Sequence, residues 1–299
     1  MKKKGDRIRG TYRVLQAFPF VQGVLYYTEV EPDSRDGKPS TPLPTRFLHG
    51  LDIRSIRKRV DLKKLLKRDT GVFFPLQGLF VEEGILYQVL GKLDGQLLAH
   101  HLYRSVPLTA NEAIHILQCV SGHLVRIYRK DLFTVVHPQN MLITGGSVRF
   151  LYGGPSGLLP KLKGGPPGGG RAVPEERKRQ EQMMDAYSLG ALAYIMLTGT
   201  SPSPPGNLLP IRTCRRDVPP SLEHLIMQSL LAEPESRPRV EDLWETLRRI
   251  PVDRELKKEH PICHPSADRK RSPRTPGQVN RLQRSGRGVP VVSRPDDSP

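Results

Sequence analysis

Cysteine is scarce in this sequence. The 299 residues include only Cys119, Cys214 and Cys263. These lie far apart and form no Cys-x-x-Cys pair, which argues against a zinc site and against a disulfide framework. Such sparse cysteine usage suits a reducing compartment, so we expect the protein to be cytoplasmic.

Long hydrophobic runs are also lacking. The longest apolar stretch, YSLGALAYIML at residues 187–197, is too short to span a bilayer. The basic start, MKKKGDRIRG, is not followed by the apolar core that a signal peptide needs. We therefore expect neither secretion nor a membrane span.

Acidic residues are outnumbered by basic ones. The chain has 47 Lys and Arg against 30 Asp and Glu, a net charge of +17. Such a charge favours contact with polyanions, such as nucleic acid, an acidic protein or anionic lipid. The alternative is a solvated basic surface without a dedicated partner, because the charge is spread along the chain and no nucleic-acid-binding motif is present.

The first ninety residues are rich in strand signals. β-branched and aromatic residues are dense over 12–30, and Pro19 and Gly23 interrupt them, which predicts two strands joined by a short turn. A polar, Pro-rich loop is predicted at 31–45. Further along we predict a short strand at 46–49, a basic helix at 53–67, and strands around 72–80 and 84–90 with a turn at 82–83.

The hydrophobic period then changes to that of helices. Thr109 and Glu112 form a capping box that opens a helix, and a strand pair is predicted on either side of Gly145 and Gly146. Residues 153–170 are so rich in Gly and Pro that no regular structure is expected there. Further helices are predicted at 183–198, ending at Gly199, from Ser221 onward, and at 239–250.

These signals predict an α+β protein with two lobes. We expect a small antiparallel-sheet lobe over residues 10–92 and a larger helical lobe over 93–250. Together they would form one domain. From 251 to 299 the chain is polar, with repeated Pro and Arg, and we expect most of this tail to be disordered.

Four motifs narrow the choice of fold. In order, they are HPQNMLI (137–143), VPE (173–175), DAYSLGALAYIMLTGTSP (185–202) and LAEPESRP (231–238). Their order and spacing resemble the eukaryotic-type serine/threonine protein kinases, including the bacterial members, over roughly residues 10–250. The resemblance implies a kinase-like fold in which Glu175 pairs with Arg237 and tethers two distant segments. It also implies that Asp185, at the start of its helix, accepts hydrogen bonds from the backbone of the catalytic loop.

Most of the residues that bind the ATP phosphates in that family are replaced by other residue types here. Where the family has Gly-x-Gly-x-x-Gly, this chain reads FPFVQG over 18–23, so only Gly23 remains and two phenylalanines replace glycines. The lysine of the third strand is missing from RFLHG (46–50). Arg46 or His49 is the nearest substitute, and neither is equivalent to lysine. Asp61 is the candidate carboxylate partner.

The catalytic and metal-binding acids are missing as well. The segment FTVVHPQN (133–140) places Val135 where the family has its catalytic Asp, and His137 where it has a Lys. Leu151, in LYG (151–153), replaces the Asp that ligates Mg²⁺, a metal that requires oxygen donors. Asn140 is retained, but alone it does not hold a metal, so a turn-stabilising hydrogen bond is its expected role.

The replaced residues are the ones that bind phosphate, bind metal or act on the substrate in that family. The residues expected to stabilise the fold are kept. We therefore expect a pseudokinase that acts as a binding, scaffold or regulatory protein, with no metal site and no cofactor. Its partner would be a protein, such as an active kinase or its substrate. Two alternatives stay open: a serine/threonine kinase with residual activity that uses ATP and Mg²⁺, and a basic protein that binds nucleic acid or another polyanion.

Overall fold

The computed structural model describes residues 1–31, 43–57, 60–159, 174–203 and 207–250, all of them within one compact unit. The side chains of residues 174, 175 and 177 also lie outside this description. The predicted tail at 251–299 and most of the predicted loop at 31–45 lie outside the described residues as well. No helix among the described residues combines the length and the apolar character that crossing a membrane requires.

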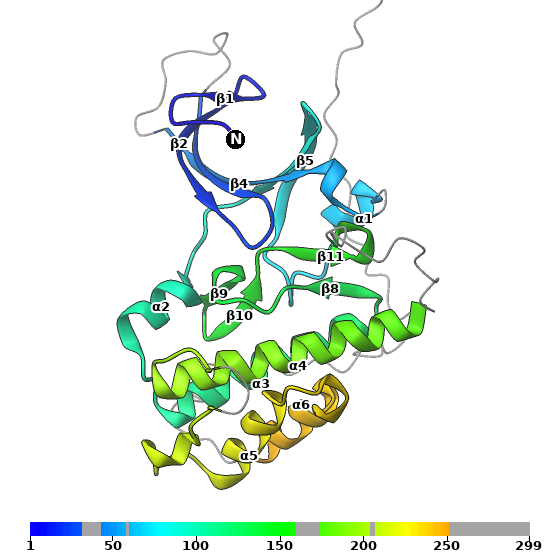
Figure 1. Ribbon diagram of the computed structural model, residues 1–299. Helices are drawn as coiled ribbons and strands as arrows, with labels where there is room; N and C mark the ends of the chain where they lie inside the picture. The colour runs from blue at the N-terminus through cyan, green and yellow to red at the C-terminus, as the bar shows by residue number, and fades with distance from the viewer. Residues whose placement is uncertain (32–42, 58–59, 160–173, 204–206, 251–299) are drawn as a thin grey trace, which may run out of the picture. The chain divides into compact units, whose positions relative to one another are not determined.

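The first lobe is a six-stranded antiparallel sheet with the order β1-β2-β3-β4-β6-β5 (Figure 1). Its strands are β1 (Arg7–Ile8), β2 (Tyr12–Pro19), β3 (Val24–Val30), β4 (Thr45–Asp52), β5 (Leu76–Glu82) and β6 (Ile85–Leu90). The strands predicted over 12–30, 46–49 and 84–90 are confirmed, and the one predicted around 72–80 begins at Leu76. The turn at 82–83 is tight because Glu83 and Gly84 both have a positive φ.

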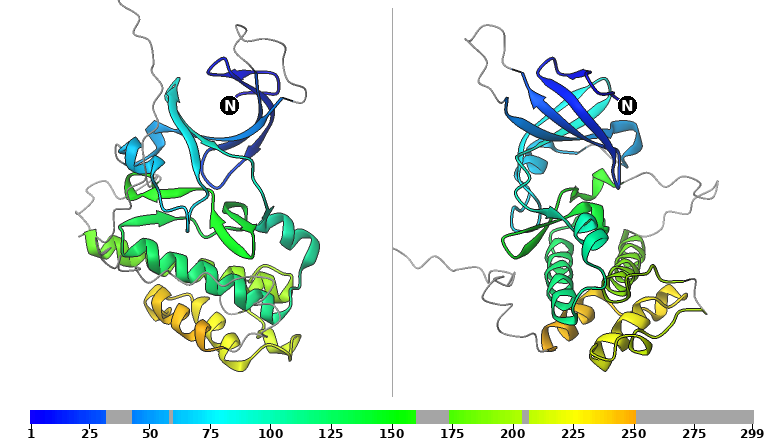
Figure 2. Two further views of the ribbon diagram at one scale, coloured as in Figure 1. Left: turned by 180° about the vertical axis from the view of Figure 1, so that it is seen from behind. Right: turned by 90° about the vertical axis from the view of Figure 1, so that its left-hand side faces the viewer.

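The sheet curls until its two edges meet (Figure 2). The backbone N–H of Arg9 donates to Oε1 of Glu82 at 2.9 Å, and the rings of Tyr12 and Phe80 stack with centroids 6.1 Å apart. These contacts join β5 to the segment around β1 and β2. The curl encloses the buried side chains of Ile8, Val14, Tyr26, Leu48, Tyr87 and Val89. Because β1 takes part, the lobe includes residues before the predicted boundary at residue 10.

The prediction of one helix over 53–67 is wrong. The described residues there form a 3-10 turn, η1 (Ile53–Ser55), and a short helix, α1 (Leu62–Leu66). Asp52 accepts a hydrogen bond from the backbone N–H of Arg54, and Asp61 accepts from those of Lys63 and Lys64. Aspartate side chains compete for backbone N–H groups in this way and therefore favour a helix start over a helix interior.

The second lobe is mainly helical, with α3 and α4 side by side in both figures. Its helices are α2 (Leu98–Ser105), α3 (Ala110–Tyr128), α4 (Pro174–Thr198), α5 (Pro220–Ser229) and α6 (Val240–Arg249). Helix α6 packs on α3, and α5 packs on α4. The predicted cap is present, because Thr109 accepts a hydrogen bond from the N–H of Glu112 at 3.2 Å. Gly199 ends α4 as predicted, with a φ of 75°.

Short strands and turns connect the helices. Strands β7 (Gln96–Leu97), β9 (Met141–Thr144) and β10 (Ser147–Phe150) form one small sheet, and β8 (Leu132–Thr134) pairs with β11 (Gly153–Pro155). The 3-10 turns are η2 (Pro138–Asn140), η3 (Ser156–Leu158), η4 (Ile211–Thr213) and η5 (Pro234–Ser236). The strand pair predicted around Gly145 and Gly146 is therefore confirmed.

Two sequence predictions for this lobe need correction. Strand β11 lies in the Gly- and Pro-rich segment where no regular structure was expected. A Cβ on Gly153 would lie 2.4 Å from the Phe73 ring and 2.6 Å from the Phe133 carbonyl, so glycine is what allows this close packing. Helix α4 begins at Pro174 rather than near residue 183, which places Asp185 in the interior of the helix instead of at its start.

Candidate functional site

Several residues at positions where the resembled family binds nucleotide or metal meet where the two lobes join. There the apolar side chains of the two lobes share buried clusters, one of which includes Leu25 and Leu151 and another Leu51 and Tyr152. The backbone joins the lobes too, because Phe74 donates to the Phe150 carbonyl at 2.8 Å. We call this region the junction and define it by five residues. They are Gly23, His49, Arg68, Asn140 and Leu151.

His49, and not Arg46, faces the junction. Side chains alternate along a strand, so two residues three positions apart lie on opposite faces of β4. The ring of His49 lies 5.1 Å, centroid to centroid, from both Phe20 and Tyr152. Arg46 donates instead to the carbonyl of Thr45 at 2.8 Å. The alternation therefore decides between the two candidates that the sequence left open.

His49 is neutral and fully engaged. Its Nε2 lies 2.5 Å from the carbonyl oxygen of Gln22, and its Nδ1 lies 2.9 Å from Nε2 of Gln88. The carbonyl can only accept, so Nε2 carries the proton and Nδ1 accepts from the Gln88 amide. Burial lowers the pKa of His49 to about 4, which leaves the ring uncharged at pH 7. It therefore supplies no positive charge for a phosphate.

Gly23 lies at the tip of the β2–β3 hairpin, against β4. A Cβ at this position would lie 2.2 Å from the carbonyl oxygen of Gly50, and the residue has a φ of 78°. The glycine thus allows the hairpin to contact its neighbouring strand directly. The side chain of Phe20, in the same hairpin, packs edge-on against His49.

Arg68 is a buried cation that the sequence analysis missed. Its guanidinium donates to the carbonyl of Phe74, at 3.1 Å from Nε and 2.5 Å from Nη2, to that of Leu151 at 2.9 Å, and to that of Gly153 at 3.3 Å. Burial lowers its pKa to about 9, so it remains charged at pH 7. Asp61, the predicted acidic partner at this place, caps α1 instead. Nothing in the sequence separates Arg68 from the other basic residues around it.

Asn140 is completely buried and makes hydrogen bonds through both ends of its amide. Nδ2 donates to Oγ1 of Thr134 at 3.2 Å, to the Val135 carbonyl at 2.9 Å and to the Tyr152 carbonyl at 3.0 Å. Oδ1 accepts from the Tyr152 N–H at 2.7 Å. Asn140 therefore ties the loop around Val135 to the chain that follows Leu151.

Leu151, Val135 and His137 occupy the remaining positions where the resembled family has catalytic or metal-binding side chains. Leu151 is buried in apolar surroundings, and Val135 is half-buried against similar side chains. His137 is exposed, and its Nδ1 accepts a hydrogen bond from the Gln139 N–H at 3.2 Å. Within the described residues, no three His, Cys, Asp or Glu side chains are grouped so that they could hold a metal ion.

The pairing of Glu175 with Arg237 stays a prediction, because the side chain of Glu175 lies outside the described residues. Arg237 itself donates to the carbonyls of Leu231, Ala232 and Met183 at 2.9, 3.2 and 3.3 Å. Its guanidinium also lies 4.8 Å from the centroid of the Tyr187 ring. These bonds fix the loop around η5 to helix α4.

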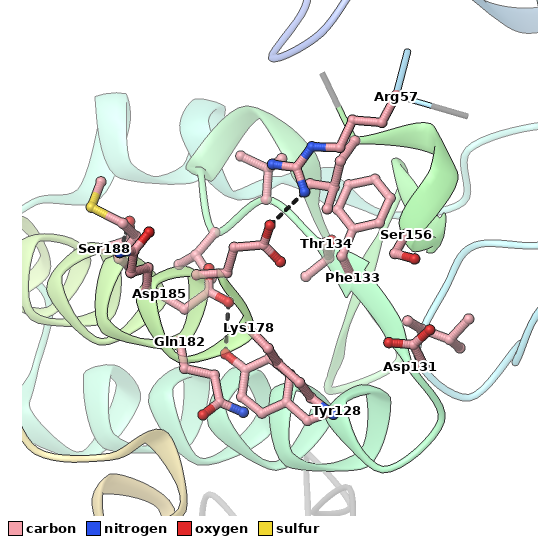
Figure 3. Close-up of a pocket in the computed structure, with 17 residues that line it drawn as sticks. Arg57, Tyr128, Asp131, Phe133, Thr134, Ser156, Lys178, Gln182, Asp185 and Ser188 are labelled. Carbon is pink, nitrogen blue, oxygen red and sulfur yellow. Dashed lines mark hydrogen bonds and ion pairs between the residues drawn. The ribbon is translucent and has the colours of Figure 1, made fainter. Parts of the chain in front are cut away.

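A cavity of about 390 Å³ lies beside the junction, between the β8 segment and helix α4 (Figure 3). Val135 and Asp185 both line it. Asp185 was expected to accept hydrogen bonds from the backbone of the loop. Instead its Oδ2 accepts from the Tyr128 hydroxyl at 2.6 Å. The difference follows from the position of Asp185 inside α4, which faces Tyr128 on the neighbouring helix α3.

The electrostatics of this cavity centre on Asp185. Burial raises its pKa to about 7, the negative charge of Glu181 acts in the same direction, and the hydrogen bond from Tyr128 opposes both. Glu181 itself is paired with Arg57 at 2.6 Å (Figure 3). No local pattern in the sequence predicts this cavity, because its walls come from segments far apart in the chain.

Comparison with known proteins bears on the fold. No protein-family model matches the chain, and no curated protein matches it. Among solved structures, it is similar to a point mutant of the Mycobacterium tuberculosis PknI kinase domain, with a TM-score of 0.51 and 17% sequence identity. The match covers 83% of this chain and 98% of that one. The curled antiparallel sheet and the helical lobe of this chain therefore form a protein-kinase-like fold.

Proposed function

We propose that this protein is a pseudokinase, a kinase-like protein that transfers no phosphate and acts by binding a protein partner. One observation carries the proposal: the polar side chains at the junction are bonded to the protein itself. His49 is neutral with both nitrogens engaged, and Asn140 uses both ends of its amide. Neither remains available for a phosphate or a metal.

Phosphoryl transfer requires several groups at once, so the engagement of His49 and Asn140 weighs strongly against it. It needs a cation on the phosphates, oxygen ligands for Mg²⁺ and a group that orients the attacking hydroxyl. Arg68 is charged, but three carbonyls occupy its guanidinium. Asp185 has the pKa of a general base, yet a base alone moves no phosphate without the other two devices. By the resemblance, Leu151 takes the place of the metal-binding Asp, and its side chain has no oxygen to offer.

Part of the surface suits a protein partner. Leu62 and Leu66, one helical turn apart on α1, are 40% and 44% exposed. Lys63 and Lys64 lie beside them on the same helix. An apolar pair flanked by cations suits a partner with apolar and acidic side chains, such as an active kinase or one of its substrates.

The test is a phosphotransfer assay with purified protein, radiolabelled ATP, Mg²⁺ or Mn²⁺, and a generic basic protein as acceptor. We expect no label above a mock purification, and ATP with Mg²⁺ should leave the melting temperature unchanged. An active serine/threonine kinase serves as the positive control. Label above the mock would overturn the proposal, because the mock purification already accounts for a contaminating kinase.

A further inference from the structure

The cavity between β8 and α4 has no part in the proposed function and stands on separate observations. Most of its wall is apolar, with contributions from Phe133, Val135 and Leu159. Its volume of about 390 Å³ falls within the range of about 300–1,000 Å³ that small-molecule sites usually occupy. A carboxyl group, that of Asp185, projects into these apolar surroundings.

One oxygen of that carboxyl is available. Tyr128 donates to Oδ2 at 2.6 Å, whereas Oδ1 has no hydrogen-bond partner within the described part of the chain. Within the described residues, the fully buried side-chain atoms that lack a hydrogen-bond partner are Oε2 of Glu82 and Oε1 of Gln88. Oδ1 of Asp185 is not one of them, so it is not fully buried. It is therefore reachable from the cavity that Asp185 lines.

The remaining charged groups do not satisfy this oxygen. Glu181 and Arg57 form an ion pair with each other at 2.6 Å. Lys178 and Asp131 also line the cavity, and their formal charges are opposite. Three carboxylates therefore line the cavity against two cations, and burial disfavours the charge of Asp185 until a further cation binds.

We propose that this cavity binds a cation carried on an apolar stem, which is a primary ammonium or a guanidinium group. The cation donates a hydrogen bond to Oδ1 of Asp185, and the stem lies against Phe133, Val135 and Leu159. A free alkylamine and a Lys or Arg side chain of a bound peptide share this chemistry. An anion would meet a carboxylate, and a neutral molecule would forgo the charged hydrogen bond, which is the stronger kind.

The first experiment compares two probes with the same stem, n-hexylamine and 1-hexanol, by calorimetric titration at pH 8. We expect the amine to bind at least about tenfold more tightly, the size of a hydrogen bond to a charged group. In Asp185→Asn, which keeps an acceptor for Tyr128, that advantage should vanish while hexanol binding persists. The control Glu245→Gln removes an exposed carboxylate of α6 and should bind both probes like the unchanged protein.

The pH dependence supplies a readout that needs no folded Asp185 variant. Amine affinity should rise from pH 6 to pH 8 as Asp185 loses its proton, and the binding heat should show proton release near pH 7. The titratable and charged groups that line the cavity with Asp185 are Glu181 and Lys178 on α4, Tyr128 on α3, and Asp131 and Arg57 from the adjoining segments. In Tyr128→Phe the midpoint should move upward, because the Tyr128 hydroxyl lowers the pKa of Asp185.

A second pair of probes separates the two sources of the cation. These are a short peptide with a central arginine and the same peptide with citrulline, which has the shape of arginine but no charge. Preference for the arginine peptide over hexylamine assigns the cavity to a peptide side chain, and the reverse assigns it to a free amine. Equal affinity for hexylamine and hexanol at pH 8, or an amine preference that survives in Asp185→Asn, overturns the proposal. Because no assay contains ATP, these outcomes are independent of phosphotransfer.

Discussion

At the junction, burial determines how His49 responds to pH. The pKa of His49, about 4 in the folded protein, lies below the usual value of 6.5. Between these two values the unfolded chain binds a proton that the folded chain does not. The histidine therefore contributes stability above pH 6.5, and that contribution is lost as the pH falls toward 4.

We predict that replacing His49 by Gln flattens the acid limb of the stability curve. At pH 4.5 the unchanged protein should have lost about 2 kcal/mol of unfolding free energy through this group, and the variant none of that amount. Urea denaturation at pH 7.5 and 4.5 measures the difference. His224→Gln, at an exposed position, is the control and should follow the unchanged protein. Parallel pH curves for all three proteins would contradict the prediction.

Among the elements, the β2–β3 hairpin depends on close contact with β4. Gly23 and Gly84 have nearly the same backbone conformation, with φ of 78° and 75°. A Cβ on Gly23 would lie 2.2 Å from the Gly50 carbonyl, whereas nothing lies within 4 Å of a Cβ on Gly84. The two glycines therefore separate backbone strain from steric contact.

We predict that Gly84→Ala costs about 1 kcal/mol, the strain of a left-handed residue, and that Gly23→Ala costs about 3 kcal/mol, because the hairpin must also move away from β4. Chemical denaturation measures both values. Equal losses would show that the hairpin shifts freely and that its contact with β4 contributes nothing to stability.

Elements were predictable from sequence where a local signal specifies them. The Thr109 cap and the Gly199 stop are such signals, and both ends lie where the sequence placed them. The helix predicted at 53–67 failed because the capping role of Asp61 was overlooked. The strand at Gly153 could not be foreseen, since glycine is needed there only because Phe73 and Phe133 approach it closely.

The same distinction applies to the site. Val135, Asn140 and Leu151 could be named as candidates because the spacing of the resembled family's motifs points to them, and their roles stay a prediction. Arg68 bonds to carbonyls 83 and 85 positions away, and the cavity brings Arg57 together with Glu181, 124 positions away. Contacts of that range depend on the folded chain, and hydrophobic periodicity contains no information about them.

For the molecule as a whole, the junction should make the two lobes unfold together. The pairing of residues 72–74 with Phe150 and the bonds of Arg68 connect the sheet lobe to the helical lobe. We predict one calorimetric transition whose measured enthalpy agrees with the van't Hoff enthalpy.

Arg68→Met should lower the unfolding free energy by about 3 kcal/mol, since it leaves buried carbonyls without a donor, and should separate the transition into two. Arg54→Met is the control, because that side chain is 85% exposed and its loss should change the melting curve very little. A single, unshifted transition in Arg68→Met would show that the lobes are coupled by other contacts.

The acceptors of Arg68 also affect how this protein tolerates genetic change. An ordinary ion pair is lost when either of two codons mutates. The oxygens that hold Arg68 belong to the main chain, at Phe74, Leu151 and Gly153, and every amino acid supplies such an oxygen. Missense changes at Phe74 and Leu151 keep those two acceptors, whereas any side chain at Gly153 would collide with Phe73. The mutational target of this tether is therefore the codons of Arg68 and Gly153.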